Sequence, residues 1–348
     1  MSGLRRCVVI GASAGGVEAL REVVARLPGG LAVPVFVVLH IPPYVASSLP
    51  QILGRSGPLR AVHPRDGAVA EAGVIYVAPP DHHLLLDGRH VAVKKGPKEN
   101  RFRPSIDALF RSAAYTCGPG AIGVVLSGML DDGTSGLWSV ERLGGTTVIQ
   151  EPNEARFEDM PRSAMNYVRV DHNLPSTQIG ALIGRLVGQA RPAAAAKGAA
   201  RHADDKARMK KELEIAAENS AYQKGVMELG KLTPFTCPEC HGVLVRIAEG
   251  KMSRFRCHTG HAYTDSALLE AVMEFTGEAL WQVIRSFEES LMLLDHMGRH
   301  LKEAGDPGRA RTFFAKAREL EKRSRTFHEA VLEHESLSGD NLGQEPAQ

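Results

Sequence analysis

The most reactive candidate in the sequence is Ser13, which lies in residues 11–16 (GASAGG) directly after the β-branched residues 7–10. The pattern G-x-S-x-G is typical of a nucleophile elbow, a tight strand-to-helix turn that exposes the serine hydroxyl. Backbone N–H groups at the start of the following helix can bind a developing oxyanion. Such a turn can also bind phosphate or simply reverse the chain. A dinucleotide site fits less well, because Ser13 replaces the second glycine and His40, not an acid, ends the next strand.

A base and an orienting acid follow two other apolar stretches. His40 comes directly after residues 35–39, and the pair Asp131 and Asp132 comes shortly after residues 122–126. Because the carboxyl ends of parallel strands meet at one edge of a sheet, these side chains are predicted to lie near Ser13. A neutral imidazole there can take the serine proton, and a carboxylate can orient that imidazole. The pattern does not choose between the two aspartates, and four histidines compete with the proposed base: His63, His82, His83 and His90.

A second constellation has the spacing of a metal site. Cys237 and Cys240 form a C-x-x-C pair, and Cys257 is followed by His258 and His261. Soft thiolate and imidazole ligands from two short turns suit tetrahedral zinc, and a closed four-ligand site is structural. We expect Cys237, Cys240, Cys257 and His261 as ligands, with His258 as the alternative fourth ligand. Redox-active or structurally idle cysteines are less favoured alternatives.

Composition excludes several classes of protein. The chain has 348 residues, of which 43% are hydrophobic and 24% charged, as in soluble globular domains. A net charge of +2 predicts neither nucleic-acid binding nor an acidic tail, and no apolar run is long enough to insert into a membrane. The five cysteines are too few for a disulfide framework, so we expect a cytoplasmic protein.

The first half of the chain reads as an α/β domain with a doubly wound, mostly parallel, Rossmann-like sheet. Strands are predicted at residues 7–10, 35–40, 74–77, 122–126 and 147–149, with a hairpin near 90–93. Amphipathic spacing predicts helices at residues 17–27, 106–115 and 135–143. We assign residues 1–189 to this catalytic domain.

The second half reads as a smaller, zinc-braced α-helical domain. Residues 190–205 have almost no large apolar side chain and are predicted to be a linker. Residues 206–335 form the predicted zinc-binding helical module, with helical composition over 206–232 and an αα-hairpin over 265–333 that turns at residues 305–308 (GDPG). Residues 336–348 are predicted to be a disordered tail.

Taken together, the motifs of the first domain resemble the CheB-type chemotaxis protein-glutamate methylesterases. The matching segments span residues 6–190 and are, in order, 10–16 (IGASAGG), 40–43 (HIPP), 76–79 (YVAP), 103–107 (RPSID), 127–129 (SGM), 132–133 (DG) and 160–161 (MP). The resemblance implies a serine hydrolase that needs no cofactor for catalysis. Its substrates would be γ-glutamyl methyl esters on the cytoplasmic helices of chemoreceptors, and some members also deamidate glutamine.

The resemblance also implies a role for each site residue. Ser13 would be the nucleophile and His40 the base. Asp132 would orient His40, because the family's aspartate directly precedes glycine. The backbone N–H of Met129 would bind the oxyanion, and the elbow geometry adds the N–H of Ala14.

Two departures from the family pattern bear on activity. Many members carry threonine where this sequence has Ala14. The elbow also lies within about a dozen residues of Met1, so we expect no control by a preceding receiver domain. The C-terminal module is similar to the zinc-ribbon and helical extensions of some standalone members, and we expect it to dock on the catalytic domain, on a receptor, or on a methyltransferase or other chemosensory protein. The alternative function is a catalytically weak domain that serves as a binding or adaptor module.

Overall fold

The computed structural model describes residues 4–189, 199–218 and 220–339. The chain divides into two compact units, of which the first ends at Leu268 and the second begins at Leu269. A domain boundary is predicted at residues 190–205, whereas the first compact unit continues to Leu268. Residues 190–198 of that predicted linker lie outside the described residues, and a helix begins at Ala199.

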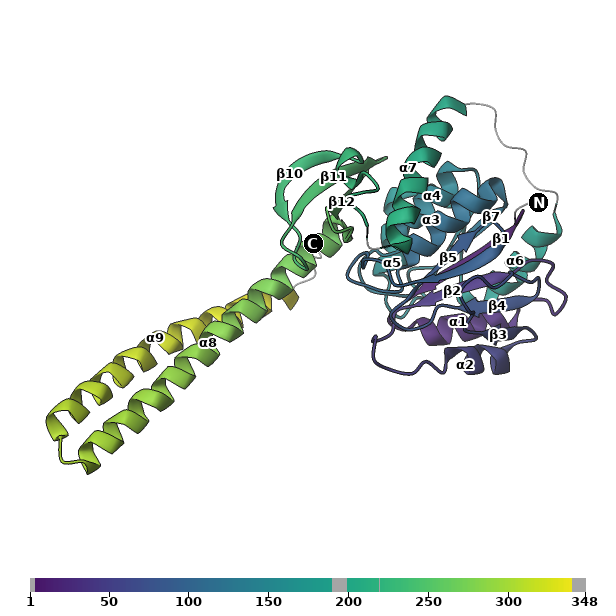
Figure 1. Cartoon of the computed structure of the whole chain (residues 1–348). Coiled ribbons are helices and arrows are strands. Elements are labelled where there is room, and N and C mark those ends of the chain that lie inside the picture. The colour runs from purple at the N-terminus through teal and green to yellow at the C-terminus, as the bar shows by residue number, and fades with distance from the viewer. Residues whose placement is uncertain (1–3, 190–198, 219, 340–348) are drawn as a thin grey trace, which may run out of the picture. The chain divides into compact units, whose positions relative to one another are not determined.

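The first unit is built around a seven-stranded sheet in which every described pairing is parallel. Its order is β3-β4-β2-β1-β7-β8-β9, and the most central strand, β1, pairs with β2 and β7 (Figure 1). The bounds are β1 Cys7–Ala12, β2 Val35–Leu39, β3 Arg60–Val62, β4 Val74–Val77, β7 Ala121–Val125, β8 Thr146–Gln150 and β9 His172–Leu174. The expected strands at residues 7–10, 35–40, 74–77, 122–126 and 147–149 are confirmed, whereas β3 and β9 were not predicted.

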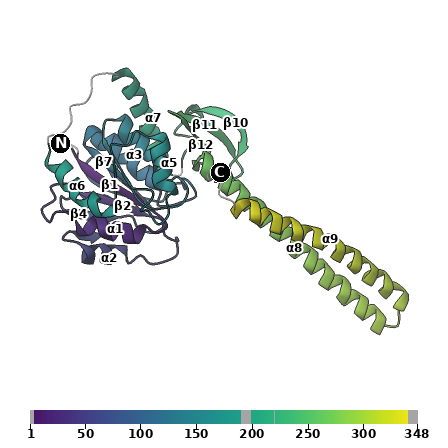
Figure 2. The same cartoon turned by 180° about the vertical axis from the view of Figure 1, so that it is seen from behind.

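Helices cover both faces of this sheet, as expected for a doubly wound fold (Figures 1 and 2). Helices α1 (Gly16–Ala25), α2 (Leu49–Ser56) and α6 (Ser176–Gly188) pack on the face that Val8 and Ile10 present. Helices α3 (Ile106–Cys117), α4 (Thr134–Arg142) and α5 (Asp159–Tyr167) pack on the face of Cys7 and Val9. A short antiparallel hairpin, β5 (His83–Asp87) and β6 (His90–Lys94), adds to this second core.

The rest of the first unit contains a small sheet that the sequence analysis did not predict. Helix α7 (Ala199–Ala217) ends well before the predicted limit at residue 232. It is followed by four antiparallel strands in the order β10-β11-β12-β13. Their bounds are β10 Lys231–Thr236, β11 Val243–Glu249, β12 Met252–Cys257 and β13 Ala262–Thr264. The predicted helical module therefore contains four strands after its first helix.

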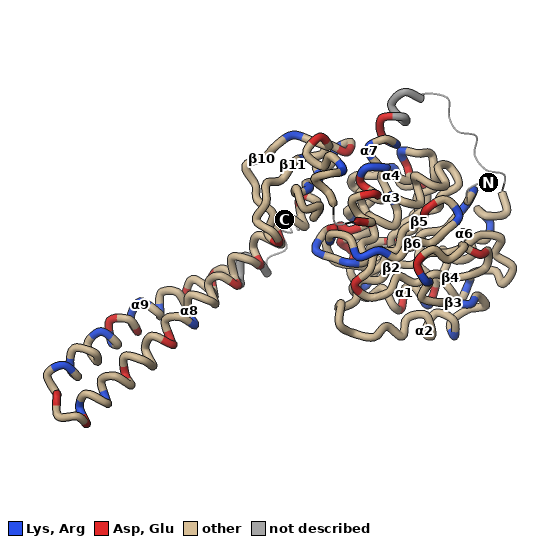
Figure 3. Tube along the Cα trace, in the orientation of Figure 1, with Lys and Arg blue, Asp and Glu red and all other residues tan. Residues whose placement is uncertain are grey.

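The second unit is an αα-hairpin, as predicted, formed by α8 (Asp265–Glu303, beginning in the first unit) and α9 (Pro307–Gly339). Four side chains of α9 are buried at a spacing of seven residues: Ala310, Ala317, Ser324 and Val331. This heptad spacing is typical of a coiled-coil seam. Charged residues of both signs occupy many of the other positions of α9 (Figure 3). Helix α9 runs to Gly339, so residues 336–339 of the predicted tail are helical, and residues 340–348 lie outside the described residues.

Among the described residues, no helix is both long enough and apolar enough to cross a membrane.

Candidate active site and cysteine cluster

The structure brings Ser13, His40 and Asp132 into one hydrogen-bonded row. His40 Nδ1 lies 3.1 Å from Ser13 Oγ, and His40 Nε2 lies 2.8 Å from Asp132 Oδ2. The side chains of His40 and Asp132 are 4% and 2% exposed, so water does not compete for their contact. When Nε2 carries the hydrogen that it donates to Asp132, the lone pair of Nδ1 is free to accept the serine proton. The row can therefore deprotonate a nucleophilic serine.

Adjacent strand ends position the three residues. Ser13 follows β1, His40 follows the neighbouring β2, and Asp132 lies in the loop after β7 on the other side of β1. Backbone hydrogen bonds fix these ends: the His40 N–H donates to Ala12 O at 3.2 Å, and the Ser13 N–H donates to Ser127 O at 2.9 Å. Parallel strands deliver their carboxyl ends to one edge, where open α/β folds carry their sites.

Two backbone positions around Ser13 need glycine, one in the turn after Ser13 and one in the loop after β7. Gly15 has φ of 69° and caps the N-terminus of α1, in the left-handed region that favours glycine. A Cβ at Gly128 would lie 2.0 Å from Met160 Sδ and 2.8 Å from Ser13 Cβ, so the loop after β7 approaches the nucleophile closely. These close approaches bring the backbone around Ser13 and Met129 to the same side of the site.

The proposed oxyanion donors are the backbone N–H groups of Ala14 and Met129. Neighbouring amides are already engaged, since the Gly128 N–H donates to Phe157 O at 3.0 Å. In the part of the chain that the structure describes, none of the hydrogen bonds uses the N–H of Ala14 or Met129. The Met129 side chain is exposed at this edge. Both groups thus stay candidates for binding an oxyanion.

The Asp132 carboxylate is surrounded by donors. Oδ2 accepts from the Ile106 N–H at 2.8 Å, and Oδ1 accepts from the Asp107 N–H at 3.2 Å and Ser105 Oγ at 3.1 Å. These amides belong to the first turn of α3, where the helix dipole favours an anion. Burial alone would raise the pKa of Asp132, but the hydrogen bond and charge of His40, the Ile106 amide and an Asn100 amide hold it below its usual value. The carboxylate therefore stays ionised beside His40.

The two aspartates of the pair have different partners. Asp131 accepts from Thr264 Oγ1 at 2.7 Å and from Ser266 Oγ at 2.8 Å, and has no contact with His40 among those described. Burial raises the pKa of Asp131 to about 6 despite these two hydrogen bonds. The geometry therefore assigns Asp132 to the row and Asp131 to the segment that joins β13 to α8.

The competing histidines have other partners. His63 Nδ1 bonds to Val77 O at 2.9 Å, His82 Nδ1 to Pro80 O at 2.9 Å and His83 Nε2 to Pro97 O at 2.8 Å. His90 is exposed on β6. Of the candidate bases, the structure brings His40 to Ser13.

Sequence reasoning missed two residues that contact the row. The ring of Phe102 stacks on His40, with centroids 3.7 Å apart and planes 10° from parallel. The Asn100 amide nitrogen lies 2.9 Å from Asp132 Oδ1. Both residues stand just before residues 103–107 (RPSID), but nothing in their spacing marks them, because they reach the site through an irregular loop in which Asn100 has φ of 51°.

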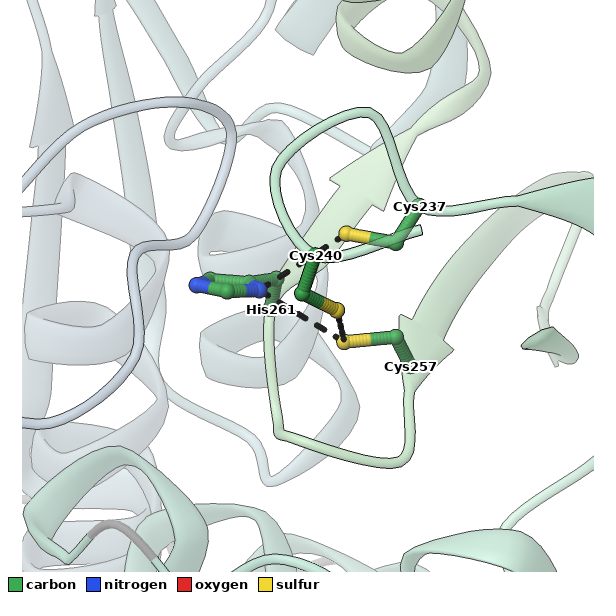
Figure 4. Close-up of side chains that lie close together, drawn as sticks. All are labelled: Cys237, Cys240, Cys257 and His261. Atoms are coloured by element: carbon green, nitrogen blue, oxygen red, sulfur yellow. Dashed lines mark hydrogen bonds between the residues drawn. The ribbon is translucent and has the colours of Figure 1, made fainter. Parts of the chain in front are cut away.

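Cys237, Cys240, Cys257 and His261 gather into one cluster (Figure 4). Their ligand atoms all lie within 4.8 Å of one another, with 3.6 Å between the Cys240 and Cys257 sulfurs and 3.6 Å from His261 Nδ1 to each of two sulfurs. Two sulfurs bound at ~2.3 Å to one tetrahedral ion would lie about 3.8 Å apart, so the four donors fit a zinc-sized ion. His258, the alternative ligand, is not in this group, and its ring packs on Gly242.

One thiol of the cluster, that of Cys257, favours the thiolate form, whereas its hydrogen bond with Cys237 and burial raise the pKa of Cys237. Hydrogen bonding from Cys237, together with His261 and Thr259, lowers the pKa of Cys257 to about 2 although burial opposes this. The pKa of His261 is raised, because hydrogen bonds to Cys257 and Cys240 outweigh its burial. Thiolates bind metal ions, whereas thiols do not. Polarised thiols on two turns are the chemistry that a structural zinc site uses.

Buried charged residues connect strands β11 and β12 of the small sheet with helices α3 and α7. Arg254 and Arg256 of β12, Arg111 of α3 and the carboxylates of Glu99, Glu212 and Glu249 are each at most 1% exposed. Arg254 donates to Glu212 at 2.7 Å and to Glu249 at 2.9 Å, and Arg111 donates to Glu99 at 3.0 Å. Burial opposes ionisation of Glu212, but the surrounding arginines, Arg254 first, lower its pKa to about 2. We call these six residues the ionic cluster.

Comparisons with known proteins agree with this geometry over the first domain. Residues 8–183 match the family described as CheB methylesterase. The chain is 44% identical over 161 residues to protein-glutamate methylesterase/protein-glutamine glutaminase 3 of Anaeromyxobacter dehalogenans, and 39% identical over 178 residues to a protein of the same name from Rhodopseudomonas palustris. These matches cover 46% and 50% of this chain and 47% and 49% of the relatives, so it spans about half of their length.

A solved structure agrees with the fold. The crystal structure of the Thermotoga maritima CheB methylesterase catalytic domain matches at a TM-score of 0.51 with 32% sequence identity. The match covers all of that chain and 53% of this one. Ser13, His40 and Asp132 all lie within the matched residues 8–183, whereas the cysteine cluster lies beyond them. On its fold and on the match to half of its length, the chain belongs to the CheB methylesterase family.

Proposed function

We propose that this protein is a protein-glutamate methylesterase, which hydrolyses γ-glutamyl methyl esters on the cytoplasmic helices of chemoreceptors and releases methanol. The observation that carries the proposal is the hydrogen-bonded row of Ser13, His40 and Asp132 at the carboxyl edge of the parallel sheet. The names of its relatives support the substrate class. Those names also include protein-glutamine glutaminase, and deamidation would use the same acyl-enzyme.

In the first half of the reaction, Ser13 Oγ bonds to the ester carbonyl carbon while His40 Nδ1 accepts the hydroxyl proton. The carbonyl oxygen becomes negative, and we assign the N–H groups of Ala14 and Met129 as its donors. The protonated His40 then gives its proton to the methoxy oxygen. The carbon–oxygen bond of the ester breaks, and methanol leaves.

In the second half, water replaces methanol. His40 takes a proton from water as the water oxygen bonds to the acyl carbon, and the bond to Ser13 Oγ breaks as the proton returns to that oxygen. The products are a glutamate side chain and the original serine. Asp132 remains ionised throughout, because its donors stabilise the anion, and it stabilises the imidazolium that forms twice in each cycle.

We further propose that Cys237, Cys240, Cys257 and His261 hold a structural Zn²⁺ ion. The sub-4 Å spacing of their sulfur and nitrogen atoms supports this assignment. A closed set of four protein ligands leaves no open position for substrate, so the ion would brace the turns of the small sheet. The hydrolytic steps would use the groups around Ser13.

The test is methanol release from methylated chemoreceptor membranes by the purified full chain. Ser13→Ala and His40→Ala are each expected to abolish release, by at least about 10³-fold, because each removes a member of a cooperative unit. Asn153→Ala is the matched control, since this exposed side chain contacts only Glu151 among the described hydrogen bonds. No release by folded wild type with its cognate receptors would sink the esterase proposal and favour a binding or adaptor role.

A further inference from the structure

Strand β13 of the small sheet reaches the active-site row through one side chain, that of Asn100. The Thr264 N–H donates to Asn100 Oδ1 at 2.9 Å. On its other side, Asn100 Nδ2 donates to Asp132 Oδ1 at 2.9 Å and to Asp107 Oδ2 at 2.8 Å. The side chain is 3% exposed, so these bonds have no competition from solvent.

The Thr264 amide determines which way the Asn100 side chain faces. A backbone N–H can only donate, so the atom opposite it must be the amide oxygen. The NH₂ group is then directed at Asp107 and Asp132, which need donors. Without Thr264 the side chain could rotate and present its oxygen to two carboxylates, an unfavourable arrangement in a buried site.

Backbone pairing holds Asn100 in place as well. The Asn100 N–H donates to Ala262 O at 2.7 Å, and the Ala262 N–H donates to Lys98 O at 3.1 Å, so residues 98–100 run along β13. Asn100 has φ of 51°, a left-handed conformation that asparagine tolerates better than most residues. Ala262 directly follows His261 of the cysteine cluster.

Strand β13 and the residues after it also form hydrogen bonds with the loop that carries Asp132. Thr264 Oγ1 and Ser266 Oγ bond to the two oxygens of Asp131, the residue before Asp132. Thr264 therefore contacts the site twice, through its amide on Asn100 and through its hydroxyl on Asp131.

Electrostatics explain why a donor is needed at this point. Asp107 and Asp132 are both buried, and burial together with the charge of Asp132 raises the pKa of Asp107 well above its usual value. The Asn100 amide donates to one oxygen of each group and so stabilises the charge that Asp132 must keep. Asp107 in turn accepts from the Gly133 and Gly136 amides at 2.9 Å and 2.6 Å, which fixes the loop that carries Asp132.

We propose that Asn100 is a positioning residue for Asp132 and that strand β13, by holding Asn100, makes the small sheet a working part of the hydrolase. The inference rests on the proposed esterase function for its kinetic readout only. Residues of the last third of the chain would thereby control the geometry of a catalytic carboxylate in the first half.

The first test compares Asn100→Asp, Asn100→Ala and the control Asn153→Ala in the full chain, with p-nitrophenyl acetate as substrate. Asn100→Asp keeps the shape and the acceptor for Thr264 but replaces the donor by an oxygen facing two carboxylates. We expect kcat to fall about 10- to 100-fold in both Asn100 variants, with KM within twofold of wild type, because a misplaced triad slows chemistry more than binding. Asn153→Ala should match wild type.

A second readout does not depend on turnover. The downfield proton NMR signal of His40 Nε2–H, identified by its loss in His40→Ala, reports the hydrogen bond to Asp132. We expect this signal to move and broaden in Asn100→Asp and to stay unchanged in Asn153→Ala. If wild type shows no hydrolysis, the esterase proposal fails and this signal alone decides the role of Asn100.

A mutant cycle tests the part played by β13. The variant Thr264→Val/Ser266→Ala removes both hydroxyl bonds to Asp131 and is expected to lower kcat in the wild-type background. The two hydroxyl bonds to Asp131 hold the strand whose Thr264 amide bonds to Asn100, so if the strand acts through Asn100, the same two changes should lower kcat less in the Asn100→Ala background than in wild type. A folded Asn100→Asp with kcat within twofold of wild type and an unchanged signal would overturn the proposal, and full additivity in the cycle would overturn the role of β13.

Discussion

The two sheets of the first unit are stabilised by different physics. The strands of the large sheet are buried on both faces by apolar side chains, so that β1 and β2 contain only fully or nearly fully buried residues. The strands of the small sheet have several exposed positions, and the ionic cluster and the cysteine cluster include residues of these strands and of the segments beside them. Apolar burial is insensitive to metal, whereas thiolate and charge clusters depend on every partner being present. The large sheet is therefore stabilised by apolar packing. The small sheet depends on interactions that are lost when a metal ion or a charged partner is removed.

The largest difference between the two sheets is expected when the proposed metal ion is removed. Zinc sites contribute on the order of 10 kcal/mol in small metal-dependent domains. A strong chelator, or Cys257→Ser, is expected to reduce the hydrogen-exchange protection of β11 and β12 and to leave the protection of β1 and β2 unchanged. Hydrogen–deuterium exchange of the two sheets measures this directly. Unchanged protection in β11 and β12, together with no zinc found by elemental analysis, would show that the small sheet needs no metal.

The next largest effect is expected from the ionic cluster. Glu212→Gln removes one carboxylate and leaves buried arginines without compensation, which typically costs about 3–5 kcal/mol. The pKa of Glu212 is lowered to about 2, so its stabilising effect is complete above the unfolded value and is lost as pH falls toward 2. Denaturant unfolding of Glu212→Gln and wild type at pH 7 measures the difference. Glu214→Gln, on the same helix but with a 41% exposed side chain that lies 4.0 Å from Lys210, is the control and should change stability by less than about 0.5 kcal/mol.

A substitution in the large sheet should behave differently. Leu20 of α1 is fully buried against the sheet, and Leu20→Ala is expected to cost about 3 kcal/mol through lost burial and a cavity. Because no charge or metal is involved, this cost should be the same at low and high salt and with or without chelator. A cost that changes with either condition would mean that the two sheets do not have separate sources of stability.

The contrast also explains what could be predicted from the sequence. Ser13, His40 and the pair Asp131 and Asp132 each follow an apolar run, and the parallel topology implied by those runs predicts that they meet. The choice of Asp132 over Asp131 came from the family resemblance and not from the pattern. The cysteine and histidine spacing is likewise local. Five of the seven strands of the large sheet were found for the same reason, since continuous β-branched runs have few other interpretations.

The small sheet was missed because its strands do not have that pattern. Arg254 and Arg256 are fully buried yet look like surface residues in a sequence, since their partners Glu99 and Glu212 lie more than 40 residues away. The helical composition after residue 206 continued past the end of α7 at Ala217, so the helix was predicted to be too long. No sequence pattern marks Asn100, because its hydrogen bond to Thr264 depends on β13 lying beside it in the folded chain.

The smallest effect that still tests the comparison is expected at Asp131, where the catalytic loop meets the segment after β13. Burial raises its pKa to about 6, above the usual value of 3.8. The folded state therefore binds this proton more tightly than the unfolded state, so the stabilising contribution is present below pH 4 and is lost as pH rises through 6. Asp131→Asn is uncharged at every pH and can still bond to both hydroxyls.

We therefore expect Asp131→Asn to be more stable than wild type by about 2 kcal/mol at pH 8, because the variant never buries the charge. The advantage should disappear below pH 4, where Asp131 is protonated in both states. Thermal unfolding of the two proteins between pH 4 and pH 8 gives the difference. A variant that is less stable at pH 8 would mean that Thr264 and Ser266 need the full charge of the carboxylate, and that the small sheet is attached to the catalytic loop by charge rather than by neutral hydrogen bonds.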